Sequence, residues 1–337
     1  MALLEVQDLH VSFKTIDGVV RAVEGVSLSL EPRKTLGVVG ESGSGKSVTA
    51  QTVIGLTRFP NATITGKILF DGRDLVAMPT DQLRSIRGAR IAMIFQDPLS
   101  SLHPFFKVGH QIVEAIRTHE DVPRDVARRR AVEALRSVGI PSPEERFDSF
   151  PHEMSGGMRQ RAMIAMSIAN SPSLLIADEP TTALDVTIQA QVLEVLKTVQ
   201  DETKAATILI THDLGIVAEL CERVLVMYAG RIVEAGDVYS IFRAPRHPYT
   251  IGLLDSLPKL TEDEEWLRPI TGAPPSLINL PSGCAFHPRC FLSQGRAQCR
   301  ENVPVLNPAG EPEHLAACHY SEELVGYESK FSATVSA

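Results

Sequence analysis

The sequence predicts an α/β fold, because short apolar strands alternate with helical stretches along most of its 337 residues. The alternation is clearest at three places, where an apolar run leads into a polar motif. Strand-like apolar runs precede a glycine-rich loop at 40–47, a pair of carboxylates at 178–179 and a histidine at position 212. Such an alternation implies a mostly parallel sheet with helices on its faces. A content of 44% hydrophobic residues is enough for a sizeable core.

The glycine-rich loop lies between a predicted strand, 36–39, and a predicted helix, 48–56. Its sequence matches the phosphate-binding pattern G-x-x-x-x-G-K-S. Glycines allow a tight turn that directs backbone N–H groups at phosphate oxygens, and the helix N-terminus adds a positive dipole end. Lys46 would reach the β- and γ-phosphates, and Ser47 would help to hold Mg²⁺. The loop consists of Gly40, Glu41, Ser42, Gly43, Ser44, Gly45, Lys46 and Ser47.

A second apolar run, 174–177, ends in two adjacent carboxylates. Asp178 can hold Mg²⁺ through its shell of water, and Glu179 can polarise the attacking water as a general base. A buried strand with an acidic end would look the same in isolation. Together with the upstream loop, the pair predicts nucleotide hydrolysis.

A third motif begins a predicted helix with Ser155, Gly156 and Gly157. Free N–H groups, a hydroxyl and the helix dipole make such a start an anion site. In isolation, an ordinary serine cap is the favoured explanation of this motif. A second phosphate site in one chain makes sense if it serves a nucleotide that is bound by another subunit.

Together these motifs resemble the ATP-binding subunits of ABC transporters, and within them the dipeptide/oligopeptide importer branch, whose relatives include nickel importers. The resemblance implies a P-loop NTPase (ABC ATPase) fold. It also implies that Gln96 senses Mg²⁺ and the membrane subunits, and that Asp185 belongs to the D-loop, Ala183-Leu184-Asp185. His212 matches the switch histidine at the γ-phosphate. Phe13 is the aromatic residue expected to stack on adenine.

The third motif departs from the wider family at two positions. Met158 stands where glutamine is commonest, and Met154 stands where leucine is commonest. The importer branch resembles this chain in having methionine at position 158. The departure therefore indicates a subfamily and not an inactive site.

The resemblance also implies how the chain is divided. An ABC ATP-binding domain is expected over 1–250, with an antiparallel β subdomain and a helical subdomain at about 97–157. A C-terminal extension of the peptide-importer type is expected over 251–337. Within it, an acidic and Pro-rich stretch at 262–281 is predicted to be a linker or an extended wrap, and 321–337 to be disordered.

Four of the five cysteines fall in this extension, separated by gaps of five, eight and eighteen residues. Stable disulfides are not expected in a cytoplasmic chain, so clustered thiols indicate a metal site. Thiolates prefer zinc or iron–sulfur centres, and the lack of a Cys-x-x-Cys pair weakens the zinc interpretation. The resemblance favours a [4Fe–4S] cluster, with zinc second and free thiols third. These cysteines are Cys284, Cys290, Cys299 and Cys318.

The fifth cysteine and the histidines of the extension are not expected to bind the metal. Cys221 lies apart from the other four, in a predicted apolar helix, and is expected in the core. His287, His314 and His319 are expected to form hydrogen bonds rather than to act as ligands, since four thiols are present.

The expected location is the cytoplasmic face of the cell membrane. No apolar run reaches the roughly 18 residues that a membrane span needs, and the N-terminus lacks a signal-peptide pattern. The net charge of −8 argues against nucleic-acid binding. The resemblance implies these partners: a second ATP-binding subunit (a paralogue or another copy), two membrane permease subunits and an extracytoplasmic solute-binding protein.

The expected function is therefore ATP hydrolysis that powers the uptake of di- or oligopeptides or related small solutes. Nickel or another small solute is the alternative substrate. A soluble ABC ATPase acting on DNA or ribosomes is disfavoured by the single ATPase module and the lack of a heptad repeat. A regulatory iron–sulfur sensor is disfavoured by the intact set of catalytic residues.

Overall fold

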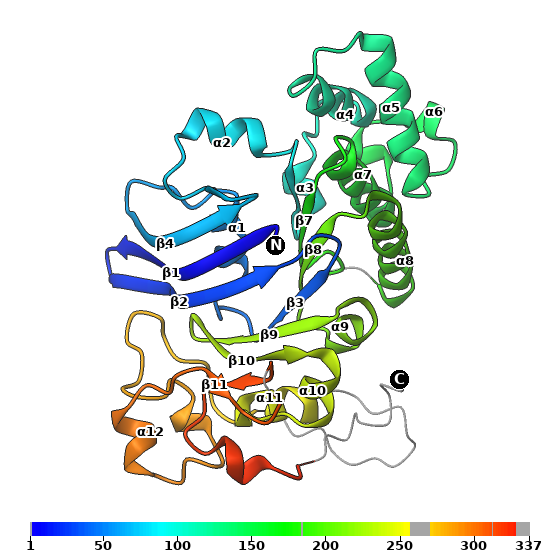
Figure 1. Ribbon diagram of the computed structural model, residues 1–337. Helices are drawn as coiled ribbons and strands as arrows, with labels where there is room; N and C mark the ends of the chain where they lie inside the picture. Colours follow the sequence, from blue (N-terminus) through cyan, green and yellow to red (C-terminus); the bar gives the residue numbers. More distant parts are fainter. Residues whose placement is uncertain (1, 183–184, 257–269, 312, 328–337) are drawn as a thin grey trace. The chain divides into compact units, whose positions relative to one another are not determined.

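The computed structural model follows the chain with short interruptions (Figure 1). The residues that it describes are 2–182, 185–256, 270–311 and 313–327. They divide into two compact units. Unit one is built mainly from Ala77–Ile210, and unit two from Glu5–Ser29, Leu36–Val76 and the chain from Thr211 onward. The glycine-rich loop thus belongs to unit two, and the carboxylate pair belongs to unit one.

Unit one contains a parallel sheet whose strands are buried along their whole length. β7 (Leu174–Asp178) pairs with β6 (Ile91–Ile94) on one side and with β8 (Ala206–Ile210) on the other. Continuous burial is typical of parallel strands that are covered on both faces. The predicted parallel sheet is therefore confirmed here, and the carboxyl ends of its strands meet at one edge.

Helices of unit one pack against each other through apolar faces; α4, α5 and α7 are in mutual contact. In α4 (Val108–Arg117), Ile112 and Ile116 are buried one helical turn apart, on the same face. Gly109 lies so close to the ring of Phe147 that a Cβ atom would stand 2.1 Å from it. The other helices of unit one are α2 (Thr80–Ile86), α3 (Pro98–Ser101), α5 (Arg124–Ser137), α6 (Pro143–Arg146), the 3-10 helix η1 (Pro151–Glu153), α7 (Gly156–Ile168) and α8 (Val186–Thr203).

Unit two begins with a sheet in the strand order β2-β1-β4-β5, the antiparallel β subdomain that the sequence analysis expected. Burial in β1 falls on Val6, Leu9 and Val11, so the alternation slips by one residue. The slip coincides with Asp8, whose φ of 47° bends the strand, and Gly66 packs directly on the Asp8 carbonyl. The strands are β1 (Leu4–Thr15), β2 (Gly18–Leu30), β4 (Ala62–Phe70) and β5 (Arg73–Asp74).

Other strands of unit two connect the strand before the glycine-rich loop to the C-terminal extension. β3 (Thr35–Val39) is parallel to β9 (Arg223–Tyr228), and β9 is antiparallel to β10 (Arg231–Asp237). β10 then pairs with the short strand β12 (Leu315–Ala316), which pairs with β11 (Asn307–Pro308). The extension is therefore hydrogen-bonded into the sheet and not merely tethered to it.

The extension continues as an extended segment. Residues 270–286 have no regular secondary structure, as the prolines predict, and the Leu277 carbonyl accepts a hydrogen bond of 3.0 Å from the Arg21 N–H of β2. The acidic part at 262–265 and Pro269 lie outside the described residues. The helices of unit two are α1 (Lys46–Val53), α9 (Leu214–Leu220), α10 (Val238–Arg243), α11 (Pro248–Asp255), η2 (His287–Arg289), α12 (Ala297–Glu301) and η3 (Ser321–Leu324).

Residues 321–327, which the sequence predicts to be disordered, are fixed by contacts to the rest of unit two. After η3, the Tyr327 hydroxyl donates to both carboxylate oxygens of Asp255 at 3.1 and 3.0 Å. The expectation of disorder from Ser321 onward is therefore wrong for 321–327, because this long-range contact cannot be read from local composition. Residues 328–337 lie outside the described part.

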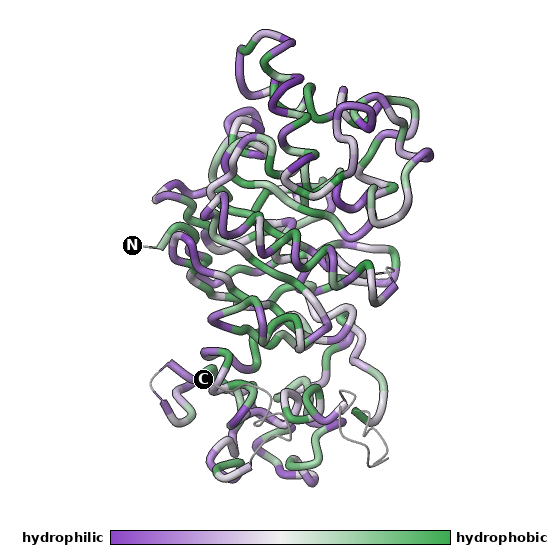
Figure 2. Tube along the Cα trace, turned by 90° about the vertical axis from the view of Figure 1, so that its right-hand side faces the viewer, coloured by the Kyte–Doolittle hydropathy of each residue, from purple (hydrophilic) through white to green (hydrophobic). Residues whose placement is uncertain are grey.

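Hydrophobic and hydrophilic residues alternate along much of the Cα trace (Figure 2). β3, β7 and β8 are buried at every position. Among helices in the described ranges, none combines the length and the apolar character of a membrane span.

A buried carboxylate fixes the extension to β10. Glu234 is fully buried, and its oxygens accept hydrogen bonds from the backbone N–H groups of Arg246 and His247 at 2.6 and 3.0 Å. Its Oε1 also lies 2.7 Å from Nε2 of His314, which is 3% exposed. Because His314 directly precedes β12, this cluster holds three segments of unit two together.

We predict that Glu234→Ala opens this region, because it leaves a buried imidazole and two backbone N–H groups without partners. Loss of one member of a buried polar pair costs about 3 kcal/mol or more, so amide exchange in β10 and β12 should rise more than about 100-fold. Hydrogen–deuterium exchange measures this. Glu313→Ala, which removes only an exposed ion pair with Arg223, should change the exchange little. Equal exchange in both variants would refute the anchoring role.

Candidate functional site

The glycine-rich loop turns from β3 into α1 within unit two. The helix begins at Lys46, two residues before the predicted start, and ends at Val53 rather than at 56. Gly40 and Gly45 have φ angles of 148° and 101°. A Cβ atom on Gly40 would stand 2.2 Å from the Met227 carbonyl oxygen, and one on Gly45 would stand 2.4 Å from the carbonyl oxygen of Ala22. Both positions therefore require glycine.

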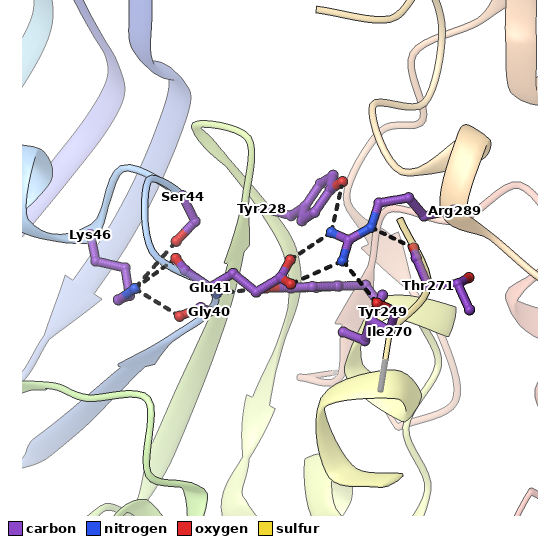
Figure 3. Close-up of polar contacts among 9 residues, drawn as sticks. All are labelled: Gly40, Glu41, Ser44, Lys46, Tyr228, Tyr249, Ile270, Thr271 and Arg289. Carbon is purple, nitrogen blue, oxygen red and sulfur yellow. Dashed lines mark hydrogen bonds and ion pairs between the residues drawn. The ribbon is translucent and has the colours of Figure 1, made fainter. Parts of the chain in front are cut away.

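Lys46 closes the loop with its own ammonium group. Its Nζ donates to the carbonyl oxygens of Gly40 and Glu41 at 2.7 and 2.9 Å, and it lies 3.5 Å from the Ser44 hydroxyl (Figure 3). The Lys46 residue is only 5% exposed. A cation is thus held within the loop, whose backbone N–H groups and adjoining helix N-terminus favour anions. Ser47 follows it as the second residue of α1.

The carboxylate pair lies at the end of β7 in unit one. Asp178 is the last strand residue and is 5% exposed, and Glu179 follows it. Oε2 of Glu179 accepts hydrogen bonds from Nε2 of Gln96 at 3.2 Å and from the Thr182 hydroxyl at 2.9 Å. The parallel pairing of β6 with β7 brings Gln96 here, because both strands end at the same edge. Gln96 itself lies two residues past the strand, which ends at Ile94.

Glu179 has a strained backbone. Its φ is 46°, in the left-handed region that a residue with a side chain seldom adopts. The Glu179 N–H is fixed by a 2.8 Å hydrogen bond to the Ile210 carbonyl at the end of β8. Strain of this kind costs about 1–3 kcal/mol and clusters at active sites. This geometry supports a functional role for Glu179.

The Ser-Gly-Gly motif begins α7 as predicted. The Ser155 hydroxyl accepts a hydrogen bond from the Met158 N–H at 3.3 Å, which makes it the N-cap. Ser155 and Gly156 are exposed, whereas Gly157 packs on Ile188, where a Cβ atom would stand 2.8 Å from the Ile188 Cγ2. The N-cap serine and the glycine after it are therefore accessible to solvent.

The remaining predicted residues lie in three places. Asp185 is exposed and caps α8 by accepting from the Ile188 N–H at 3.0 Å; Ala183 and Leu184 lie outside the described residues. His212 is exposed and follows Thr211, whose N–H donates to the Val38 carbonyl of β3 at 3.3 Å. Phe13 is half-buried near the end of β1. Unit two thus contains Phe13, the glycine-rich loop and His212. Unit one contains the other residues predicted for the nucleotide site.

The four cysteines of the extension are free thiols, and Cys290 and Cys299 are close enough to affect the pKa of both Cys284 and Cys318. The Cys284 N–H donates to the Cys299 carbonyl at 2.9 Å. Burial raises the pKa of Cys284 to about 11 and that of Cys318 to about 12, and in both cases the other cysteines add to the shift. Burial also raises the pKa of Cys290. Without a cation these side chains therefore stay protonated at neutral pH.

A zinc ion and an iron–sulfur cluster require different spacings between the four cysteine sulfurs. No group of three or more His, Cys, Asp or Glu side chains in the described ranges is arranged to hold a metal ion. A tetrahedral zinc ion with bonds of about 2.3 Å needs its sulfurs within about 4 Å of each other. An iron–sulfur cluster of the four-cysteine kind binds each thiolate to a different iron and therefore accepts a wider spacing. In the described part of the chain, the four cysteines therefore form no preformed metal site of either kind.

Of the residues predicted to lie outside any metal site, two histidines form side-chain hydrogen bonds and one cysteine lies in the core. His314 bonds to Glu234, and the His319 ring nitrogen Nε2 lies 2.9 Å from the Asn302 carbonyl oxygen. Cys221 is 8% exposed directly after α9, and burial raises its pKa to about 12. The prediction of a core cysteine is confirmed.

Sequence reasoning missed two residues that contact the phosphate loop. Tyr249 and Arg289 both bond to Glu41, although they lie more than 200 positions away in the sequence (Figure 3). Tyr249 is the second residue of α11, and Arg289 is the last residue of η2. No local pattern marks either contact.

Comparison with known proteins agrees with this architecture. The family described as "ABC transporter" matches residues 23–182, and "Oligopeptide/dipeptide transporter, C-terminal region" matches 233–299. The oligopeptide transport ATP-binding protein OppD of Bacillus subtilis is 56% identical and covers 84% of this chain and 80% of its own. The dipeptide transport ATP-binding protein DppD of Escherichia coli is 48% identical over 97% of this chain and 99% of its own.

Solved structures show the same fold. The cbiO1 protein of Clostridium perfringens, part of the ABC transporter complex cbiONQ, is 29% identical with a TM-score of 0.60, over 72% of this chain and 90% of its own. A dimeric bacterial ABC transporter cassette has a TM-score of 0.62 at 24% identity, over 70% of this chain and 98% of its own. The chain belongs to the ATP-hydrolysing, ATP-binding subunits of ABC transporters, in the oligopeptide/dipeptide transporter family.

Proposed function

We propose that this ATPase powers the import of di- or oligopeptides or related small solutes. One observation carries the proposal: a phosphate loop closed by Lys46 and a Gln96–Glu179 pair occur in a chain whose relatives at 48–56% identity are peptide transport proteins. The same chain carries the C-terminal region of oligopeptide/dipeptide transporters at 233–299. Net charge and the single ATPase module give no support to a nucleic-acid substrate.

Each proposed site residue has a chemical task. The loop and Lys46 bind the phosphates, and Phe13 stacks on the adenine. Ser47, Gln96 and Asp178 would hold Mg²⁺, which would supply positive charge to neutralise the phosphates. Glu179 accepts a proton from the attacking water, and His212 contacts the γ-phosphate. The hydrogen bonds from Gln96 and Thr182 hold the Glu179 carboxylate in one orientation.

The nucleotide site is proposed to be shared between two subunits. Ser155, Gly156 and Gly157 would contact the ATP that a paralogue or second copy binds, and Asp185 would lie at the same interface. The exposure of Ser155 and Gly156 at the start of α7 supports this role. ATP would then drive closure because it binds the closed dimer better than the open one.

Membrane permease subunits are the proposed partners of the segment after Gln96. Leu99, Phe105 and Phe106 are 60%, 81% and 56% exposed, and exposed apolar side chains of this size are typical of protein interfaces. Docking there would place the chain at the cytoplasmic face of the membrane. An extracytoplasmic solute-binding protein would deliver the substrate to the permeases.

The four cysteines are proposed to hold a [4Fe–4S] cluster with a structural role. The support is chemical: four buried or half-buried free thiols near one another, each with a raised pKa. A cluster stabilises the thiolate forms that burial otherwise disfavours. The residues that would bind it are Cys284, Cys290, Cys299 and Cys318.

Glu179→Gln should lower kcat for ATP at least about 100-fold, because an amide cannot accept the proton of water. ATP binding should remain, and closed ATP-bound dimers should accumulate. Steady-state hydrolysis and equilibrium binding measure the two effects. Glu194→Gln, at an exposed position of α8 in the same unit, should hydrolyse ATP normally. Normal turnover in Glu179→Gln would disprove the assignment.

Ser155→Arg should leave ATP binding to the isolated chain unchanged, because that serine faces a nucleotide of the partner. Hydrolysis by the assembled transporter should be lost, since the long cation blocks closure. Ser85→Arg, at an exposed serine of α2, controls for added bulk and charge. Equal loss of ATP binding by the isolated Ser155→Arg chain would show that the site is not shared.

Protein purified without oxygen should be brown and contain about four irons per chain. Cys290→Ser should lose the colour and the iron, whereas Cys221→Ala should keep both because Cys221 lies outside the cluster. Visible absorption and metal analysis test this. Colourless wild-type protein with one zinc per chain would favour a zinc site. Wild-type protein without any metal would favour the third interpretation, free thiols.

A further inference from the structure

Glu41 places a negative charge inside the loop that binds a polyanion. Its carboxylate is 27% exposed and lies five residues before Lys46. A carboxylate at this point repels a triphosphate unless a cation neutralises it, and the repulsion grows where water is partly excluded. The loop therefore needs a compensating charge from elsewhere in unit two.

Arg289 supplies that charge. Its Nη1 and Nη2 donate to the two carboxylate oxygens of Glu41 at 2.6 and 3.0 Å, in the two-bond arrangement that is strongest for this pair (Figure 3). The Arg289 side chain is only 5% exposed. Both charges are thus neutralised by a partly buried contact that solvent screens weakly.

The guanidinium is itself held firmly. Nε donates to the Thr271 carbonyl at 3.0 Å, Nη2 reaches the Ile270 carbonyl at 3.4 Å, and Nη1 lies 3.3 Å from the Tyr228 hydroxyl. Every nitrogen of the side chain therefore has a partner. Two segments, 270–271 and the end of β9 at Tyr228, fix the orientation in which Arg289 meets Glu41.

The backbone of Glu41 is held from the same side. Its N–H donates to the Tyr249 hydroxyl at 2.7 Å, while its carbonyl accepts from Lys46. Tyr249 is fully buried and packs on Tyr228 and Phe286, with ring centroids 4.6 and 5.3 Å away. A rigid aromatic group thus sets the position of the loop residue whose charge Arg289 neutralises.

We propose that Arg289 is a positioning residue for ATP binding, which acts through Glu41 to neutralise and fix the phosphate-binding loop. The inference rests on the proposed ATP site at this loop. Its consequence is that nucleotide affinity depends on the C-terminal extension. An extension displaced from the loop would leave an unpaired carboxylate beside the phosphates.

The test is the affinity of the full chain for a fluorescent ATP analogue. Arg289→Met keeps the length of the side chain but removes its charge, so the Kd should rise about tenfold or more. Glu41→Gln combined with Arg289→Met removes both charges and should return the Kd to within about threefold of the wild-type value. Arg296→Met breaks the analogous two-bond pair with Glu323, away from the loop, and should leave the Kd unchanged.

A purely structural role predicts a different result. It would lower the fraction of chains that bind the analogue, leave the Kd of that fraction unchanged and give no rescue in the double variant. An unchanged Kd in Arg289→Met, or a double variant as weak as Arg289→Met, would overturn the inference. Lys46→Ala tests the underlying site separately: if it binds normally, the ATP site is wrongly assigned, whatever Arg289 does.

Discussion

Two backbone carbonyl groups from neighbouring strands lie directly against the phosphate loop, and the rest of the site depends on this close contact. Gly40 lies against the Met227 carbonyl of β9, and Gly45 lies against the Ala22 carbonyl of β2. No side chain fits at either position, so the loop takes its shape from two strands that come from distant parts of the sequence. The Lys46 ammonium then fills the interior of the loop and bonds to its carbonyls. Phosphate-binding geometry is thus a property of the packed unit and not of the octapeptide alone.

The sequence predicted this loop and the strands around it because their signals are local. A five-residue apolar strand, a glycine pattern and a following helix lie within twenty positions, and each has its own periodicity. Gln96 and Glu179 lie 83 positions apart; the family resemblance assigned a role to Gln96, but the bond between the two side chains was not predicted. The structure supplies the physical reason, since parallel neighbours such as β6 and β7 end at the same edge of their sheet.

Contacts between distant polar residues could not be predicted in this way. Glu41 and Arg289 are 248 positions apart, and an arginine beside a cysteine in a proline-rich segment carries no sign of its partner. The anchoring of Glu234 by His314 and the bond from Tyr327 to Asp255 were hidden for the same reason. The left-handed φ of Glu179 was equally invisible, because strain is imposed by the surrounding sheet and not by the residue.

Because the Glu41–Arg289 pair is partly buried, it couples the free energy of the phosphate loop to that of the extension. An exposed pair contributes little, and its loss would be absorbed by water. A pair with an arginine side chain 5% exposed behaves differently, because removing one partner leaves a desolvated charge. The η2 turn that carries Arg289 lies between Cys284 and Cys290, so the position of the guanidinium follows the packing of the cysteine-bearing segment. Any change that moves this turn must therefore alter either the charge beside the phosphates or the path of the loop.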